Sequence, residues 1–178
     1  MMGPLWGATR DLHHAAEQHP VAVRMSSGTI SEQEWADWLH AHWTIQQGLD
    51  PHLPLCVRRS DALARDLLEL LPIKGTPSPA ATAFAATLTD PVMIFGSAYL
   101  TIGAHRRGGR VIEKAMRAAG RHLPSRHIVF EDPKAAELFV SEMRECPEIA
   151  EGARSAFAAL IDILDEIEGR ADGRRAAT

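Results

Sequence analysis

The chain has 178 residues, 46% of them hydrophobic, and its formal net charge of −4 and pI near 6.1 make it slightly acidic. This size favours one globular domain with a full core, and the charge balance argues against nucleic acid or a membrane as a partner. Two cysteines form no disulfide framework, no apolar run is long enough to span a bilayer, and the N-terminal residues lack a signal-peptide pattern. We therefore expect a cytoplasmic protein.

The apolar periodicity is helical throughout, and it predicts about seven helices. They are expected at residues 5–20, 31–49 and 62–71, in a short segment from Pro79, at 91–119, in a segment from Pro133, and at 147–167. Ser31 with Glu34 is a capping box, and Asp61, Asp90 and Asp132 are the expected caps of later helices.

No repeat or linker divides the sequence into parts. We therefore expect a single all-α domain over residues 1–168, followed by a disordered tail over residues 169–178 with the sequence GRADGRRAAT.

One stripe on the first predicted helix has the chemistry of a metal ligand. Thr9, His13 and Glu17 are spaced by four residues and share a helical face. A histidine that binds a metal through one ring nitrogen needs an acceptor for the proton on the other, and Glu17 is one turn away. Alone, such a pair is more often a solvated surface pair. His14, about 100° around the helix, is expected to face solvent.

The long helix after Asp90 is interrupted by glycines at positions 96, 103, 108 and 109. Each costs about 1 kcal/mol relative to alanine in a helix interior, so a kink or a close approach to the backbone is expected. A flat, bulky ligand against this helix would need such a surface, and so would a closely packed neighbouring helix. This segment alone does not choose between the two.

Taken together, the two segments resemble the heme oxygenase family. The proximal helix of that family carries Thr-x-x-x-His-x-x-x-Glu, which Thr9, His13 and Glu17 match, and a Gly-x-x-[Thr/Ser] turn follows, as at Gly28 and Ser31. An aromatic second helix comes next, and here it keeps the family's spacing from the histidine.

The distal helix of the family has a tyrosine before a glycine-rich kink that ends in Gly-Gly. Tyr99 and the pair Gly108-Gly109 are similar to it. The resemblance covers residues 5 to about 165 and implies a helical bundle of the biliverdin-producing, bacterial type. Heme would lie between the first helix and the kinked distal helix.

The resemblance implies a heme-degrading monooxygenase. His13 would bind the iron, Glu17 would support it, and Arg10, Tyr99 and Lys134 would meet the heme carboxylates. Heme would be both cofactor and substrate, cleaved with O2 to biliverdin, carbon monoxide and ferrous iron. A ferredoxin or an NADPH-dependent reductase would supply electrons, and a bilin-binding photoreceptor is a possible recipient of the product.

The distal side departs from the family's patterns. Mammalian-type members have Gly-Asp where this chain has Ala104 and His105, and that aspartate organises the water that supplies protons. Bacterial members have Glu-Gly-Ser where this chain has Ile102, Gly103 and Ala104, with one residue more before the Gly-Gly pair. The resemblance assigns oxygen activation to the segment of Gly103, Ala104, His105, Gly108 and Gly109. His105 could hold water, bind iron or face solvent.

The alternative is a non-catalytic heme-binding or heme-trafficking protein of the same fold. Related helical folds also include di-iron oxidases and thiamine-degrading enzymes, but the chain has no Glu-x-x-His motif and no evident base beside either cysteine. The remaining candidates are discounted. We expect Trp35, Trp38 and Trp43 to be core residues, His40 and His42 to lie on different faces, and His122 and His127 at most to bind adventitious metal.

Overall fold

The computed structural model describes residues 3–177, and over these residues the chain forms nine α-helices and no strand. The helices are α1 (Pro4–Gln18), α2 (Pro20–Ser27), α3 (Glu32–Leu49), α4 (Ser60–Glu69), α5 (Pro79–Ala85), α6 (Pro91–Gly103), α7 (Gly109–Ala118), α8 (Pro133–Arg144) and α9 (Ala150–Ala176). The predicted all-α fold of one domain is confirmed.

Two features raise the number of helices from about seven to nine. The first helix ends before Pro20, as expected, but Pro20 begins a further helix, α2, at whose start the ring of His19 accepts a hydrogen bond from the backbone N–H of Val21. The predicted long helix after Asp90 is divided into α6 and α7 by a π turn, Ala104–Gly108.

The expected helix starts are correct in three of four cases. Ser31 and Glu34 make both bonds of the capping box, and Asp90 and Asp132 each accept two backbone N–H bonds at the starts of α6 and α8. The prediction for Asp61 is wrong, because this residue lies inside the first turn of α4 and makes no capping bond. The buried carboxylate of Asp50 takes that role.

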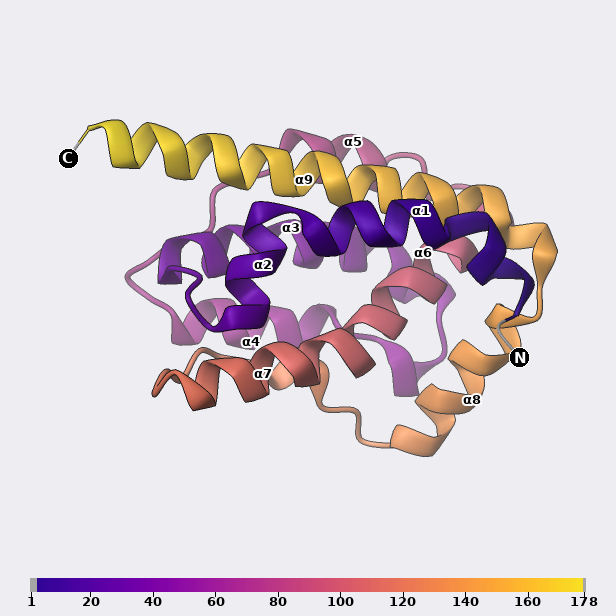
Figure 1. The fold of residues 1–178 in the computed structure, drawn as a ribbon. Coiled ribbons are helices and arrows are strands. Elements are labelled where there is room, and N and C mark those ends of the chain that lie inside the picture. Colours follow the sequence, from indigo (N-terminus) through magenta and orange to yellow (C-terminus); the bar gives the residue numbers. More distant parts are fainter. Residues whose placement is uncertain (1–2, 178) are drawn as a thin grey trace.

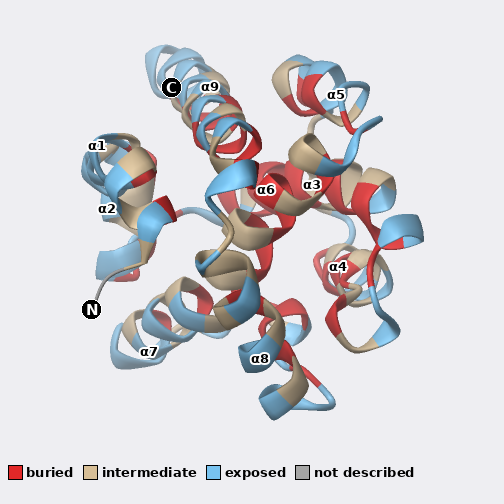
Figure 2. Cartoon of the chain, turned by 90° about the vertical axis from the view of Figure 1, so that its right-hand side faces the viewer, coloured by how far each residue is buried: buried red, intermediate tan, exposed pale blue. Residues whose placement is uncertain are grey.

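The centre of the molecule is formed by α3 and α6, and the other helices surround them (Figure 2). In Figure 1 the long helix α9 runs beside α1 and over α6. At the crossing of α6 and α9, a side chain on Gly96 would overlap the backbone nitrogen of Ala153, and one on Gly152 would overlap the carbonyl oxygen of Val92. Gly96 therefore serves close helix packing.

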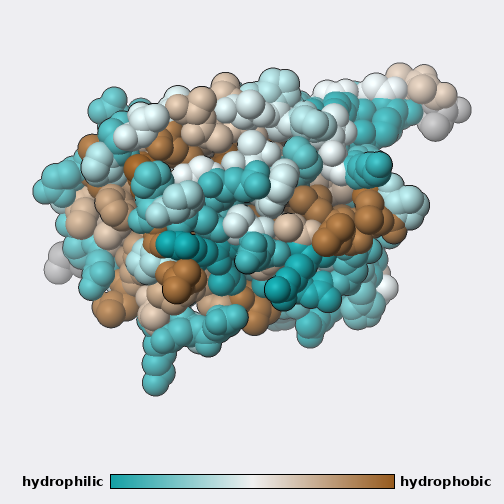
Figure 3. Space-filling model, turned by 180° about the vertical axis from the view of Figure 1, so that it is seen from behind, coloured by the Kyte–Doolittle hydropathy of each residue, from teal (hydrophilic) through white to brown (hydrophobic). Residues whose placement is uncertain are grey.

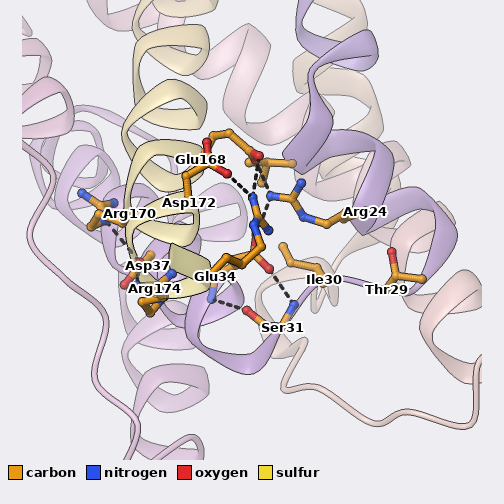
Figure 4. Close-up of polar contacts among 12 residues, drawn as sticks. Arg24, Thr29, Ile30, Ser31, Glu34, Asp37, Glu168, Arg170, Asp172 and Arg174 are labelled. Carbon is orange, nitrogen blue, oxygen red and sulfur yellow. Dashed lines mark hydrogen bonds and ion pairs between the residues drawn. The ribbon is translucent and has the colours of Figure 1, made fainter. Parts of the chain in front are cut away.

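The end of α9 corrects the expected disordered tail. Residues 169–176 continue the helix, and residue 178 lies outside the described residues. The buried carboxylate of Asp37 lies 3.3 Å from Nε of Arg170 and 3.8 Å from Nη1 of Arg174, so it ties the end of α9 to α3 (Figure 4). A buried carboxylate needs such partners, and they order the segment.

A second ionic contact joins three helices beside the first. Arg24 of α2 lies between Glu34 of α3 and Glu168 of α9 and donates to both carboxylates (Figure 4). This contact closes the end of the bundle where α2 leaves α1.

The surface seen from behind in Figure 3 is mostly hydrophilic, with apolar atoms in separate patches. Among the helices of residues 3–177, none combines the length and the hydropathy needed to cross a bilayer.

Candidate functional site

A cavity of about 710 Å³ lies between α1 and the kinked helix formed by α6, the π turn and α7. Its walls are mostly apolar, with side chains from α2, α3, α8 and α9 closing the sides. Small-molecule sites have about 300–1,000 Å³ and the same apolar character with a few polar groups. The cavity therefore has the size and chemistry of a site for a bulky organic ligand.

The stripe on α1 faces this cavity, since Thr9, His13 and Glu17 all line it. The hydroxyl of Thr9 donates to the carbonyl of Leu5 at 2.8 Å and is thus turned to its own helix. His13 Nδ1 lies 3.4 Å from Oε2 of Glu17, although the geometry is not that of a hydrogen bond, and Nδ1 is buried without another partner. This orientation leaves Nε2 as the nitrogen for a ligand.

Aromatic rings hold His13 in place. The ring of Trp6 meets it edge-to-face with centres 5.3 Å apart, and Phe157 of α9 does so at 5.7 Å. The His13 side chain remains 34% exposed, so it is reachable from the cavity. His14 is exposed, as expected from its place on the helix.

The glycines of the opposite wall have separate roles. A side chain on Gly108 would meet nothing within 4 Å, and one on Gly103 would touch only Val140 at 4.0 Å. Both glycines line the cavity, so they keep its wall flat. Gly109 also lines it, but a side chain there would overlap Ile128, so it serves loop packing as well.

The cations at the cavity differ from those expected. Arg107 of the π turn and Arg144 of α8 line it, together with Tyr99. Arg10 and Lys134 are not among the described residues that do. Arg10 is directed to Asp11, with its Nε 3.2 Å from the carboxylate, and Lys134 is exposed in the first turn of α8.

His105 does not face the cavity in the structure. Ala104 lines the cavity beside it, but His105 is 1% exposed and points to the other side of the π turn. Its ring contacts His42 of α3, with centres 5.3 Å apart, and His127 of the following loop, at 5.0 Å. Of the three alternatives left open for His105, facing solvent is therefore excluded.

His42 is the histidine that opposes α1 across the cavity. It lines the cavity beside Trp38, and the two rings lie 4.0 Å apart. Burial, with a smaller contribution from neighbouring His127, lowers the pKa of His42 to about 3. Burial also lowers the pKa of His105 well below its usual value, with contributions from His127, His42 and Arg59. Both rings are neutral at physiological pH.

We call His42, His105 and His127 the histidine cluster. His127 is fully buried, and its Nδ1 lies 2.7 Å from Oδ2 of Asp66. Over residues 3–177, no group of three or more His, Cys, Asp and Glu side chains is arranged to hold a metal ion.

Sequence reasoning discounted His42 and His127. The spacing of Trp35, Trp38 and His42, which places them on one face of α3, is the signal that could have drawn attention to His42. His127 has no comparable signal, because its partner Asp66 lies far away in the sequence.

Comparison with known proteins reveals structural similarity only. No family model and no curated protein sequence matches the chain. Heme oxygenase-1 of the cyanobacterium Synechocystis, solved in complex with heme, superposes with a TM-score of 0.79 at 17% identity, covering 97% of this chain and 94% of that one. Synechocystis heme oxygenase-2, solved with heme and NO, gives 0.81 at 16% identity, over 96% and 86% of the two chains.

A third solved structure is heme oxygenase from Leptospira interrogans, with a TM-score of 0.75 at 18% identity, covering 91% of this chain and 97% of that one. The chain has the heme oxygenase fold. The agreement extends over nearly the whole length of each chain, so the cavity belongs to a complete heme oxygenase-like bundle.

Proposed function

We propose that the protein binds heme in the cavity between α1 and the kinked helix, with His13 as the residue that would hold the iron. The observation that carries this proposal is the combination of one large apolar cavity, a histidine on its wall, and a flat glycine surface opposite. The solved heme oxygenases with the same fold, two of them complexes with heme, support it.

The residues present fit heme. His13 would coordinate through Nε2, while Glu17 accepts the Nδ1 proton directly or through water and so fixes the tautomer. The two carboxylates of heme would lie near Arg107, Arg144 and Tyr99. The two arginines would donate charge-assisted hydrogen bonds to them. Arg10 and Lys134 are less suited, since they do not line the cavity.

We further propose that the protein cleaves heme to biliverdin, carbon monoxide and ferrous iron, using O2 and electrons from a ferredoxin or reductase. Bound heme supplies the redox chemistry and is itself the substrate. Gly103 and Gly108 would offer it a flat surface, and the apolar walls of the cavity would keep bulk water away.

A specific observation keeps a second function in view, that of a heme-binding or heme-trafficking protein without turnover. Among the described residues that line the cavity, Glu17 is the only carboxylate, and it lies on the His13 side. The opposite wall therefore offers no acid of the kind that supplies protons in mammalian-type members of the family.

Titration of the purified protein with hemin tests the first proposal. We expect a sharp Soret band in the wild type and in His14→Ala, and a weakened or shifted band in His13→Ala. Absence of the band in the wild type would reject both heme functions.

Addition of a reductant and O2 in the presence of catalase then separates the two. Loss of the Soret band with growth of broad red absorption supports cleavage, whereas a stable spectrum supports binding alone.

A further inference from the structure

The histidine cluster contains an unusual number of buried polar atoms without a partner. Both ring nitrogens of His42, both of His105, and Nε2 of His127 are buried and make no hydrogen bond to another described residue. Each unsatisfied buried group costs roughly 1–3 kcal/mol, so native proteins pair such groups with each other or with ordered water. Five such nitrogens in one cluster require an explanation.

The three rings form a continuous series that begins at the cavity. His42 lines the cavity, its ring centre is 5.3 Å from that of His105, and the next step to His127 is 5.0 Å. Because none of these rings bonds directly to another, their nitrogens need internal water molecules at the edges of the rings as partners. A buried water makes about three hydrogen bonds, and neutral imidazole offers one donor and one acceptor.

The outer end of the cluster is anchored on Asp66. Its carboxylate accepts from Nδ1 of His127 at 2.7 Å and from the backbone N–H groups of Arg126 and His127. Asp66 also faces Nη1 of Arg126 at 3.7 Å, and the Arg126 side chain is 54% exposed. The buried Asp66 carboxylate is thus separated from solvent by the partly exposed side chain of Arg126.

Two tryptophans shield the cluster from solvent. Trp35 and Trp38 stack with ring centres 4.9 Å apart, and His127 contacts both rings. Trp38 also contacts His42 and His105. The cationic group acting on His105 is Arg59, whose guanidinium donates to the carbonyl of Val129 and lies over the ring of Phe130.

We propose that His42, His105 and His127, joined by internal water, form a relay that moves protons from the His127–Asp66 pair to the cavity, with His42 as the donor at the cavity wall. The inference rests on the proposed function for the destination of the proton, which is the heme site. In this relay, His42 of α3 and His127 of the loop before α8 take the role that the distal aspartate has in mammalian-type members of the family.

The properties of the three rings suit these positions. The Asp66 carboxylate faces Nδ1 of His127, so a proton that reaches Nε2 gives an imidazolium paired with a carboxylate. His105 and His42 stay neutral, so each accepts a proton at one ring nitrogen and releases one from the other. For every proton released into the cavity His127 loses one, and it regains one from solvent water, so the charge is balanced.

One test uses the protein without heme. Nitrogen-15 NMR of histidine-labelled protein should give neutral, hydrogen-bonded ring nitrogens for His42 and His105, with magnetisation transfer from long-lived internal water. Rings that show no contact with water and no hydrogen bond would overturn the relay. This test needs no variant, so it stands even where a substitution unfolds the protein.

A second test uses the hemin-loaded protein and compares His42→Leu with His40→Leu. His40 lies two residues away on α3, where its ring contacts Trp43 and is outside the cluster. We expect His40→Leu to bind and cleave hemin as the wild type does. In His42→Leu the C–O stretch of the carbon monoxide complex should shift and heme cleavage should slow at least about tenfold, with a larger solvent isotope effect because proton delivery then limits the rate.

Asp66→Asn should slow heme cleavage in the same way, although Asp66 does not line the cavity. Unchanged C–O stretch and turnover in His42→Leu would overturn the relay while leaving the heme proposal intact. Conversely, a wild type that binds no hemin would reject the proposed function, and the NMR experiment would still decide whether the cluster is a hydrated chain.

Discussion

Acidification should destabilise the heme-free protein through His42. His42 is only 5% exposed, and neither of its ring nitrogens has a partner among the described residues. Burial lowers the pKa of this ring to about 3. In the unfolded chain the same group has a pKa of about 6.5. Between these two values the unfolded state binds a proton that the folded state does not.

The sign of the effect follows from this difference. As the pH falls below about 6.5, protonation favours the unfolded chain by about 1.4 kcal/mol per pH unit until the folded pKa is reached. At pH 5, about one and a half units lower, the loss from His42 is about 2 kcal/mol. Burial shifts the pKa of His105 in the same direction, so it adds to the loss.

Urea unfolding between pH 8 and pH 5 measures this effect. The wild type should lose about 2 kcal/mol more stability over the interval than His42→Leu, which lacks the titrating ring. His52→Gln, at an exposed position, should follow the wild type. A His42→Leu variant with the same pH dependence as the wild type would show that His42 is not buried as a neutral ring.

Three further predictions concern the cavity and the bundle. Gly108→Ala should stabilise the protein by up to about 1 kcal/mol in urea unfolding, because the added methyl group meets no other atom. Gly109→Ala should destabilise it by about 1–3 kcal/mol in the same assay, because the methyl group would overlap the following loop. Arg144→Ala should weaken hemin binding about tenfold in a titration, while Lys134→Ala, on the same helix, should not. Asp37→Ala should destabilise the protein by about 1–3 kcal/mol in thermal or urea unfolding, because Arg170 and the backbone N–H of Thr76 lose their acceptor.

The features that sequence reasoning could locate are local ones. The spacing of Thr9, His13 and Glu17 places them on one face of a helix whatever the rest of the chain does, and all three line the cavity. The capping box of Ser31 and Glu34 is similarly local, since both bonds join residues three apart.

The features that it missed depend on contacts between distant segments. His42 and His105 approach each other only because α3 and α6 cross in the core, and the anchor on Asp66 comes from α4. The end of α9 is similar. Its glycines and charges are typical of a disordered tail, but Asp37 of α3 provides partners that only the folded chain brings near.

The π turn explains why counting along the distal helix misplaced His105. The segment before Gly108-Gly109 forms a π turn, whose bonds from residue i to i+5 accommodate an extra residue within one turn. Gly103 and Gly108 are five residues apart, more than a full α-helical turn of 3.6 residues but close to one turn of this segment. Both therefore face the cavity, while His105 points away from it. The π turn that places both glycines at the cavity thus directs His105 toward α3. There His105 contacts His42, and His42 is the histidine that lines the cavity.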